Sequence, residues 1–356
     1  MHADRFRGLV DATGPFVSIY FDDSHDTADA AAQLDARLRD VRKHLEEQAV
    51  DGAVIAAIET AVRSARPPVG RSGRGMIAGG TTIVLDEHLI RPPTATVLRV
   101  SELPYLTPVV EHGMLHTSYL LVAVDHTGAD ISVHLSGTRA DAESVAGTGR
   151  GGPQGRVAEA VRKNIREVAD RLSHLADETG ADIVFITGET DARAELVAQL
   201  PERVADKAVQ LRGGGRTAGT DEAEVHHEIG QEFLRRRLAA IDDAAQRFAA
   251  GHGSGLAVAG LSAVTAALRD GAVETLIIGD LGDAAVVADH DRLALIGVDA
   301  DTVSALGGSP DRVLRADEAL PLLAVSTGAA MIRTDERLNP ADGIGAVLRY
   351  PDSAAR

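Results

Sequence analysis

The sequence predicts an α/β protein made of three small domains. Short apolar runs, typical of buried strands, alternate with longer stretches whose apolar residues recur at helical spacing. At 356 residues the chain is too long for a single core, and its 44% hydrophobic content is enough for several. Loops rich in glycine separate groups of these predicted strands and helices. We place the domains at residues 1–115, 116–250 and 251–356.

The first domain begins with an apolar run at residues 15–21, which predicts a buried strand. The polar run Asp22 to Asp26 follows; it is typical of a solvated loop that caps the next helix, and it leaves a cation site as the rarer alternative. Helices are expected at 28–48 and from about 51 to 64, the first because of apolar residues at helical spacing: Leu34, Leu38, Val41 and Leu45. Further strands are expected at 76–79, 82–85 and 96–100.

The middle domain opens with a predicted hairpin, in which strands 119–125 and 130–136 turn around Thr127-Gly128. At its tip, Asp125-His126 is typical of a turn and leaves an acid/base pair open as the alternative. The remaining elements are an amphipathic helix at 157–179, a buried strand at 182–188, and helices at 191–200 and 221–249.

The last domain is predicted to be a small α/β sandwich. Gly251 to Gly255 resembles a phosphate-binding loop, but a helix precedes it where such a loop requires a strand, so we expect no nucleotide site. The expected elements are helices at 256–269 and 316–327, strands at 274–279, 284–288 and 329–333, and a closing segment at 342–350.

A glycine-rich loop at residues 147–156 is the main candidate for a functional site. Five glycines between 147 and 155 leave the backbone open to close approach, and the loop also carries Arg150, Gln154 and Arg156. Such composition is common in linkers. Bare N–H groups and guanidinium groups are also suited to a polyanion such as RNA.

The net charge of −17 argues against general binding to polyanions, so local basic runs matter. The three domains carry −4, −6 and −7. Two runs have the opposite balance, from Arg63 to Arg74 and from Arg150 to Arg171. We expect RNA contacts from these runs and from the glycines of the loop: Arg66, Arg71, Arg74, Arg150, Gly151, Gly152, Gln154, Arg156, Arg162, Lys163 and Arg166.

Cysteine is absent, which excludes disulfides and thiolate metal sites and fits a reducing cytoplasm. Met1 to Arg5 contain no apolar stretch, so no signal peptide is expected. No run of 18 apolar residues predicts a membrane span. We assign no metal, no cofactor, no membrane contact and no DNA.

The sequence also resembles a known family. Residues 268–278 (Leu-Arg-Asp-Gly-Ala-Val-Glu-Thr-Leu-Ile-Ile) and 343–350 (Gly-Ile-Gly-Ala-Val-Leu-Arg-Tyr) resemble the third domain of the archaeo-eukaryotic class-one release factors and of Pelota. The hairpin, the glycine loop and the long basic helix resemble their second domain. Residues 14–26 and 122–130 are similar to the actinobacterial branch of this superfamily, which includes relatives of the hibernation factor Balon.

The resemblance implies a ribosome-associated factor that fills the vacant A site of idle ribosomes under stress, contacts ribosomal RNA and associates with elongation factor Tu. A release factor carries Gly-Gly-Gln where this chain has Gly151-Gly152-Pro153-Gln154, and the extra proline changes the backbone that would position a water. The stop-codon signature Asn-Ile-Lys-Ser is missing. We therefore expect a binding factor, with peptidyl-tRNA cleavage through Gln154 as the alternative.

Overall fold

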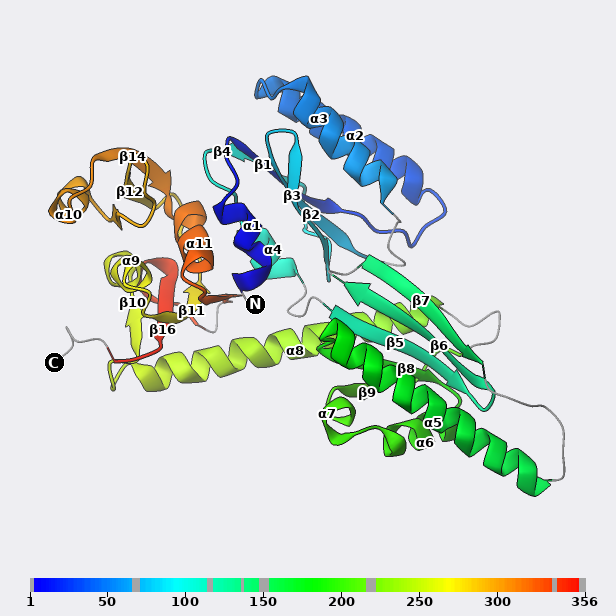
Figure 1. Ribbon diagram of the computed structural model, residues 1–356. Helices are drawn as coiled ribbons and strands as arrows, with labels where there is room; N and C mark the ends of the chain where they lie inside the picture. Colours follow the sequence, from blue (N-terminus) through cyan, green and yellow to red (C-terminus); the bar gives the residue numbers. More distant parts are fainter. Residues whose placement is uncertain are drawn as a thin grey trace. The chain divides into compact units, whose positions relative to one another are not determined.

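The computed structural model describes residues 3–65, 71–113, 118–135, 138–146, 154–215, 222–334 and 338–351. Its mixture of helices and strands in several sheets confirms the α/β class (Figure 1). The chain divides into two compact units. Unit 1 comprises residues 1–67, 71–115 and 235–356, and unit 2 comprises 68–70 and 116–234. The three-domain boundaries drawn from the sequence stay a prediction.

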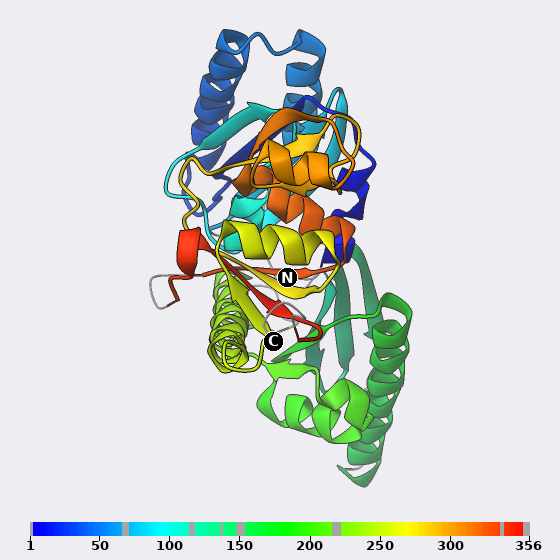
Figure 2. The same ribbon diagram turned by 90° about the vertical axis from the view of Figure 1, so that its left-hand side faces the viewer.

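The N-terminal part of unit 1 is built on an antiparallel sheet with strand order β3-β2-β1-β4. The two faces of strand β1 belong to different hydrophobic cores. Val17 and Ile19 pack against two helices on one face, whereas Phe16 and Tyr20 on the other face belong to a separate core. The two helices, α2 and α3, lie side by side over one face of the sheet (Figures 1 and 2). The bounds are β1 Phe16–Asp22, β2 Gly73–Gly79, β3 Thr82–Leu89, β4 Val97–Ser101, α2 Ala30–Glu47 and α3 Gly52–Ser64, with η1 Ala3–Phe6, α1 Arg7–Val10 and α4 Thr107–His112 beside them.

The C-terminal part of unit 1 holds two sheets, ordered β10-β16-β11-β15 and β13-β12-β14. The last strand, β16, lies between β10 and β11 and is buried throughout. The bounds are β10 Ala257–Ala259, α9 Leu261–Arg269, β11 Val273–Ile278, β12 Ala285–Asp289, β13 Ile296–Gly297, α10 Ala300–Ala305, β14 Pro310–Arg315, α11 Ala316–Ser326, β15 Ala330–Arg333, η2 Ala341–Gly343 and β16 Ile344–Leu348.

The predicted helix over 256–269 is wrong in its first turn. Ala257–Ala259 form β10, which pairs with β16, and the helix α9 starts only at Leu261. The reason is Gly260, whose φ of 90° no helix permits. The carboxylate of Asp342 then accepts a hydrogen bond from the Leu261 N–H at 3.0 Å and so satisfies one of the first free N–H groups of α9.

Unit 2 is built on a five-stranded sheet with the order β7-β6-β5-β8-β9. Strands β5, β8 and β9 of this sheet run parallel to one another. Helix α5 packs on one face through Ile165 and Val168. On the other face, Phe233 of α8 contacts the rings of Tyr119 and Phe185. The bounds are β5 Ser118–Asp125, β6 Gly128–Leu135, β7 Thr138–Ala146, α5 Gln154–Thr179, β8 Ile183–Gly188, α6 Thr190–Gln199, α7 Glu202–Ala205, β9 Ala208–Gln210 and α8 Glu222–Gly251, and the division between the units falls within α8.

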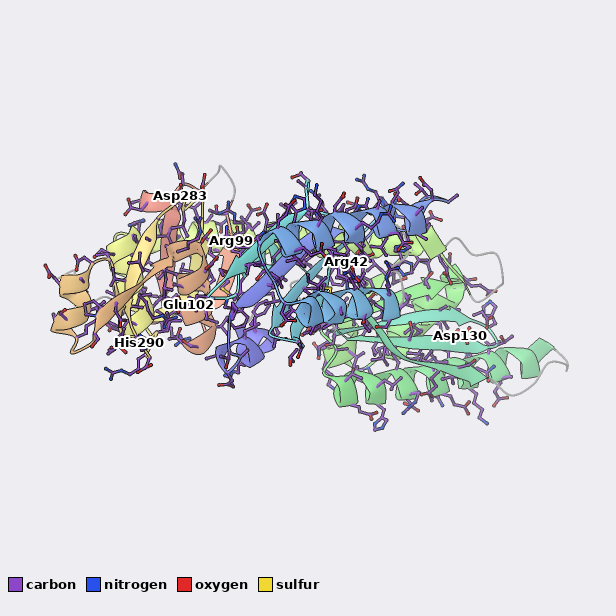
Figure 3. The ribbon with its side chains drawn as sticks, turned by 90° about the horizontal axis from the view of Figure 1, so that it is seen from above. Arg42, Arg99, Glu102, Asp130, Asp283 and His290 are labelled. Atoms are coloured by element: carbon purple, nitrogen blue, oxygen red, sulfur yellow. The ribbon has the colours of Figure 1, made fainter. Side chains whose placement is uncertain are left out.

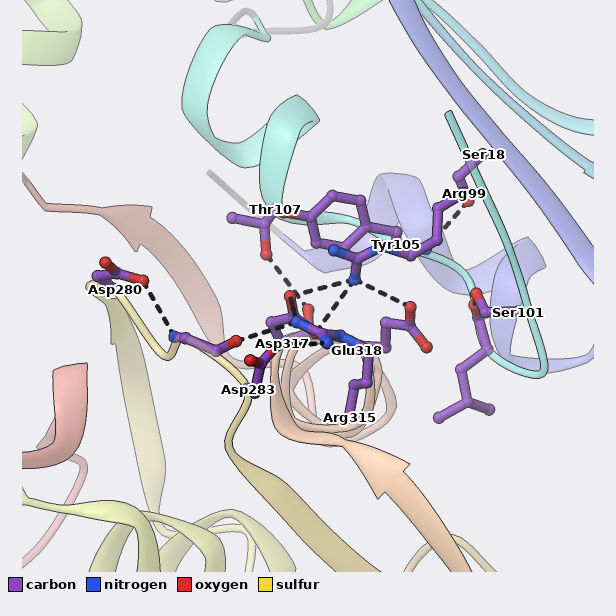
Figure 4. Close-up of polar contacts among 12 residues, drawn as sticks. Ser18, Arg99, Ser101, Tyr105, Thr107, Asp280, Asp283, Arg315, Asp317 and Glu318 are labelled. Carbon is purple, nitrogen blue, oxygen red and sulfur yellow. Dashed lines mark hydrogen bonds and ion pairs between the residues drawn. The ribbon is translucent and has the colours of Figure 1, made fainter. Parts of the chain in front are cut away.

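A charged cluster joins strand β4 to helix α11 inside unit 1 (Figure 4). The Arg99 Nη1 atom lies 3.1 Å from both carboxylate oxygens of Asp317 and 3.0 Å from Glu318 Oε1. The Arg99 guanidinium also lies 3.5 Å from the ring centre of Tyr105, and Arg315 Nε donates to Asp317 at 3.0 Å. Burial raises the pKa of Glu318 above its ordinary value, although Arg99 acts against this. The two halves of unit 1 are therefore held together partly by charge.

We expect Arg99→Ala to lower the free energy of unfolding of unit 1 by about 2 kcal/mol, because two largely buried carboxylates lose a partner while Arg315 remains. Denaturant unfolding followed by circular dichroism measures this. Arg42, which pairs with Glu59 on the exposed side of α2 and α3 (Figure 3), provides the control. Arg42→Ala should cost clearly less than Arg99→Ala, because exposed ion pairs contribute little to stability, and an equal loss in both variants would contradict the expectation.

Candidate functional site

Helix α5 carries basic residues on an exposed face and forms one part of the candidate RNA-binding site. The helix starts at Gln154, directly after Pro153, rather than near Val157 as the sequence suggested. Gln154 and Arg156 thus belong to the first turn of α5. About two turns later, Ile165 and Val168 are buried in the core of unit 2 and define the side of the helix that faces the sheet.

Three predicted cations are exposed on this helix: Arg162, Lys163 and Arg166. Lys163 lies 3.7 Å from Glu167, so its charge is partly compensated. Arg162 and Arg166 are four residues apart and so share one side of the helix. Within the part of the chain that the structure describes, neither guanidinium has an ion pair or hydrogen bond. Farther along, Arg171 is engaged by Glu143 of β7 at 2.6 Å.

Several predicted site residues lie outside the described residues: Arg66, Arg150, Gly151 and Gly152. The backbone of Gln154 and Arg156 is helical, and their RNA-binding role stays a prediction. Arg71 is exposed, as expected for a residue at the end of a basic loop.

The RNA contact predicted for Arg74 requires an accessible side chain, and the structure buries it. Arg74 lies in strand β2 and its side chain is only 3% exposed. Its Nε and Nη2 atoms donate to Asp86 at 2.7 and 2.6 Å, and its guanidinium also reaches the carbonyls of Ala61 and Val62 at the end of α3. Four of the five guanidinium N–H groups of Arg74 donate within the protein and the side chain is nearly inaccessible, so Arg74 is not available to a phosphate.

The polar run after β1 is a structural turn. Asp22 accepts a hydrogen bond from the Ser24 N–H at 2.9 Å and pairs with Arg37, and these contacts keep its pKa below the ordinary value although burial opposes them. Asp23 is buried, and burial raises its pKa. Among the described residues, no three His, Cys, Asp or Glu side chains gather closely enough to hold a metal ion.

His88 makes unit 1 sensitive to acid. Burial lowers its pKa below the ordinary value of about 6.5, and the positive charge of Arg74 lowers it further. As the pH falls through about 6.5, His88 is protonated in the unfolded chain but stays neutral in the folded chain. Protonation therefore favours the unfolded chain and lowers the free energy of unfolding. The free energy of unfolding should therefore be lower at about pH 5.5 than at about pH 7.5.

Denaturant unfolding at these two pH values tests this, with His88→Gln expected to reduce the difference. His44, which is exposed on α2, gives the control, and His44→Gln should leave the difference unchanged. The raised pKa of Asp23 acts in the opposite direction at more acidic pH, which is why the test stops at about pH 5.5. A profile that is flat in the unmodified protein would refute the expectation.

The tip of the β5–β6 hairpin does not hold the acid/base pair that Asp125-His126 left open. Asp125 accepts hydrogen bonds from the N–H and hydroxyl of Thr127, both at 2.6 Å, as in an ordinary turn. His126 instead lies 2.9 Å from Glu189, which follows β8. Asn164 of α5 donates to the His126 carbonyl at 3.3 Å. Sequence reasoning missed Asn164, although a polar residue next to Ile165 on the apolar side of a helix was a usable signal.

Comparisons with known proteins now add to this geometry. The chain is 47% identical over 364 residues to uncharacterized proteins MT2704 and Rv2629 from two strains of Mycobacterium tuberculosis, covering 98% of this chain and 97% of each relative. The model of bacterial archaeo-eukaryotic release factor family 2 matches residues 118–254. The chain belongs to the bacterial archaeo-eukaryotic release factor family. The resemblance to the release-factor family drawn from the sequence is confirmed, and the match covers β5 through the end of α8; the placement in the Balon-related branch stays a prediction.

Solved structures similar to this family member include an archaeal translation termination factor, aRF1, with 18% identity, a TM-score of 0.25 and coverage of 96% of this chain and 95% of that one. They also include Archaeoglobus fulgidus Pelota, with 14% identity, a TM-score of 0.39 and coverage of 99% and 93%. Ribosome-bound archaeal Pelota has 13% identity, a TM-score of 0.41 and coverage of 98% and 94%. At these scores the likenesses are too distant to transfer any property. In the described part of this chain, no helix combines the length and apolarity needed to cross a membrane.

Proposed function

We propose that this family member is a ribosome-associated translation factor that occupies the vacant A site of idle ribosomes in the cytoplasm under stress. The observation that carries the proposal is the pair of exposed guanidiniums of Arg162 and Arg166 on α5, which have no partner among the described residues, in a protein whose net charge is −17. An arginine fork binds phosphate oxygens in a bidentate manner and is the group most often used for that purpose.

The surrounding charge supports recognition of a particular RNA surface. Acidic residues exceed basic ones in every third of the chain, so RNA in general is repelled. The contacts are thereby restricted to the few places where positive charge gathers, namely the start of α5, the loop 147–153 and the region of Arg66 and Arg71. Family membership makes ribosomal RNA the first candidate for this surface.

Binding without chemistry is favoured by the sequence Gly151-Gly152-Pro153-Gln154. The additional residue shifts the glutamine by up to about 3.5 Å along the chain relative to a Gly-Gly-Gln loop, and catalytic geometry tolerates much smaller errors. The second candidate is cleavage of peptidyl-tRNA. It is favoured by the Gly-x-x-Gln spacing and by the place of Gln154 as the first residue of α5.

A protein partner is proposed for the acidic last third of the chain, where residues 251–356 carry 15 acidic and 8 basic groups. Elongation factor Tu is the candidate that the resemblance to the Balon-related branch supplies. Pull-down of elongation factor Tu by the full chain, set against a chain with Asp283→Lys and Asp291→Lys, tests this. Both carboxylates are exposed, so the substitutions should leave the fold intact.

The decisive experiment for the main proposal is sedimentation of ribosomes from stationary cells, followed by cryo-electron microscopy of the ribosomal fraction. Density for this chain in the A site is the expected result. Absence of the protein from that fraction would overturn the proposal.

A peptidyl-tRNA cleavage assay on loaded ribosomes separates the two candidates. The hibernation proposal expects no cleavage by the unmodified protein and unchanged occupancy in Gln154→Ala. Cleavage that disappears in Gln154→Ala would favour the second candidate instead.

A further inference from the structure

A polar cluster lies at the carboxyl ends of two parallel strands of unit 2. Strands β5 and β8 run in parallel and end at Asp125 and Gly188. Directly after them, His126 and Glu189 meet with 2.9 Å between Nε2 and Oε2, and the side chains are 48% and 55% exposed. In α/β sheets this edge is the usual place for a ligand. The pair is accessible, and its role in folding is small because exposed ion pairs contribute little.

The strands approach each other closely at this edge because residue 188 is a glycine. Gly188 has φ of 120°, and a Cβ atom there would lie only 1.9 Å from the carbonyl oxygen of Val124. The Glu189 N–H donates to that same carbonyl at 3.1 Å. This backbone contact holds Glu189 beside the turn that carries His126, so the carboxylate and the imidazole are positioned by the sheet.

Beneath this pair lies a buried amide with an unused acceptor. Asn164 of α5 is 5% exposed, and its Nδ2 donates to the His126 carbonyl at 3.3 Å. Its Oδ1 atom is buried and has no hydrogen-bond partner among the residues that the structure describes. Exchanging the two amide atoms would set the oxygen against the carbonyl, so the assignment follows from the contact itself. Buried polar atoms without a partner are rare, so this acceptor indicates that a hydrogen-bond donor, supplied by a bound molecule, is missing from the structure.

The chemistry of the cluster defines what that group must offer. The Glu189 carboxylate and the Asn164 Oδ1 atom only accept hydrogen bonds, so a phosphate, which also only accepts, does not fit. A sugar hydroxyl donates, and carboxylates bind ribose hydroxyls at this edge of α/β sheets. Lys163 and Arg166, neighbours of Asn164 along α5, are exposed and supply positive charge for the adjoining phosphates.

We propose that the cluster of Glu189, His126 and Asn164 binds a ribose 2′-hydroxyl of the RNA that α5 contacts, with the single hydroxyl proton donated to the Glu189 carboxylate, and so distinguishes RNA from DNA. The proposal rests on the function proposed above. It goes further by naming the sugar, rather than phosphate alone, as the recognised group.

The test compares a short labelled RNA oligonucleotide with the DNA oligonucleotide of the same sequence, using fluorescence anisotropy and the full-length chain. The unmodified protein should bind RNA about tenfold more tightly than DNA. Glu189→Gln and Asn164→Leu should reduce that ratio to near one while leaving the DNA affinity unchanged. Glu195→Gln, which alters a half-buried carboxylate on α6, should preserve the ratio.

Equal affinity of the unmodified protein for RNA and DNA would overturn the inference, as would a parallel loss for both oligonucleotides in Glu189→Gln. Asn164→Leu alters a buried position, so its unfolding curve is measured alongside, and Glu189→Gln decides if that variant does not fold. Ribosome sedimentation of the same preparations separates the two proposals. If the unmodified protein sediments with ribosomes but shows no sugar preference, only the inference fails; if it does not sediment, the proposed function fails.

Discussion

Arg162→Glu combined with Arg166→Glu is expected to weaken ribosome binding by about 100-fold, because two phosphate contacts become repulsions. Both side chains are exposed and lack partners in the described residues, so the fold should be unaffected. The slope of log affinity against log salt concentration should also fall by about 1.4, since each lost phosphate contact contributes about 0.7. Sedimentation with purified ribosomes at several salt concentrations measures both quantities.

A control must carry the same change in net charge. Arg203→Glu with Arg247→Glu satisfies this, because both guanidiniums are already engaged, Arg203 with Asp177 near the end of α5 and Arg247 with Glu274. This control should retain the affinity of the unmodified protein within about threefold. If both double variants lost affinity equally, overall charge rather than the face of α5 would govern binding.

Arg74→Ala is expected to lower the free energy of unfolding of unit 1 by about 3 kcal/mol. The substitution removes the partner of the Asp86 carboxylate, which solvent still reaches, and leaves the carbonyls of Ala61 and Val62 without a donor at the end of α3. Denaturant unfolding measures the loss.

Arg71 is the matched control, since it lies three residues away on the same segment and is exposed. Arg71→Ala should change the free energy of unfolding by no more than about 0.5 kcal/mol. A small effect of Arg74→Ala would contradict the structural role assigned here and restore Arg74 to the candidate interface.

Periodicity predicted the elements whose apolar residues repeat clearly. The alternation of Val17, Ile19 and Phe21 with Phe16 and Tyr20 arises because both faces of β1 are covered, which produces the continuous apolar run seen in the sequence. The helices α2 and α3 were found within a few residues for the same reason, because each buries one apolar side against that sheet.

The sequence did not predict elements that form only through pairing with a neighbouring strand. Strand β7 contains Arg139, Asp141 and Glu143 and only one β-branched apolar residue, Val145, so its composition gives no strand signal. It forms because its backbone pairs with β6 along nearly its whole length. The burial of Arg74 was missed for a related reason, since only the register of β2 with β3 places Asp86 within reach.

The position of β16 has a consequence for how the newly made chain reaches its native state. This strand fills the middle of its sheet, and unit 1 also needs residues near the start of the chain. Unit 2 is contiguous apart from residues 68–70 and contains all its strands once residue 234 has been synthesised. Unit 2 is therefore expected to fold during translation, whereas the beginning of the chain must wait, incompletely packed, until the last strand leaves the exit tunnel.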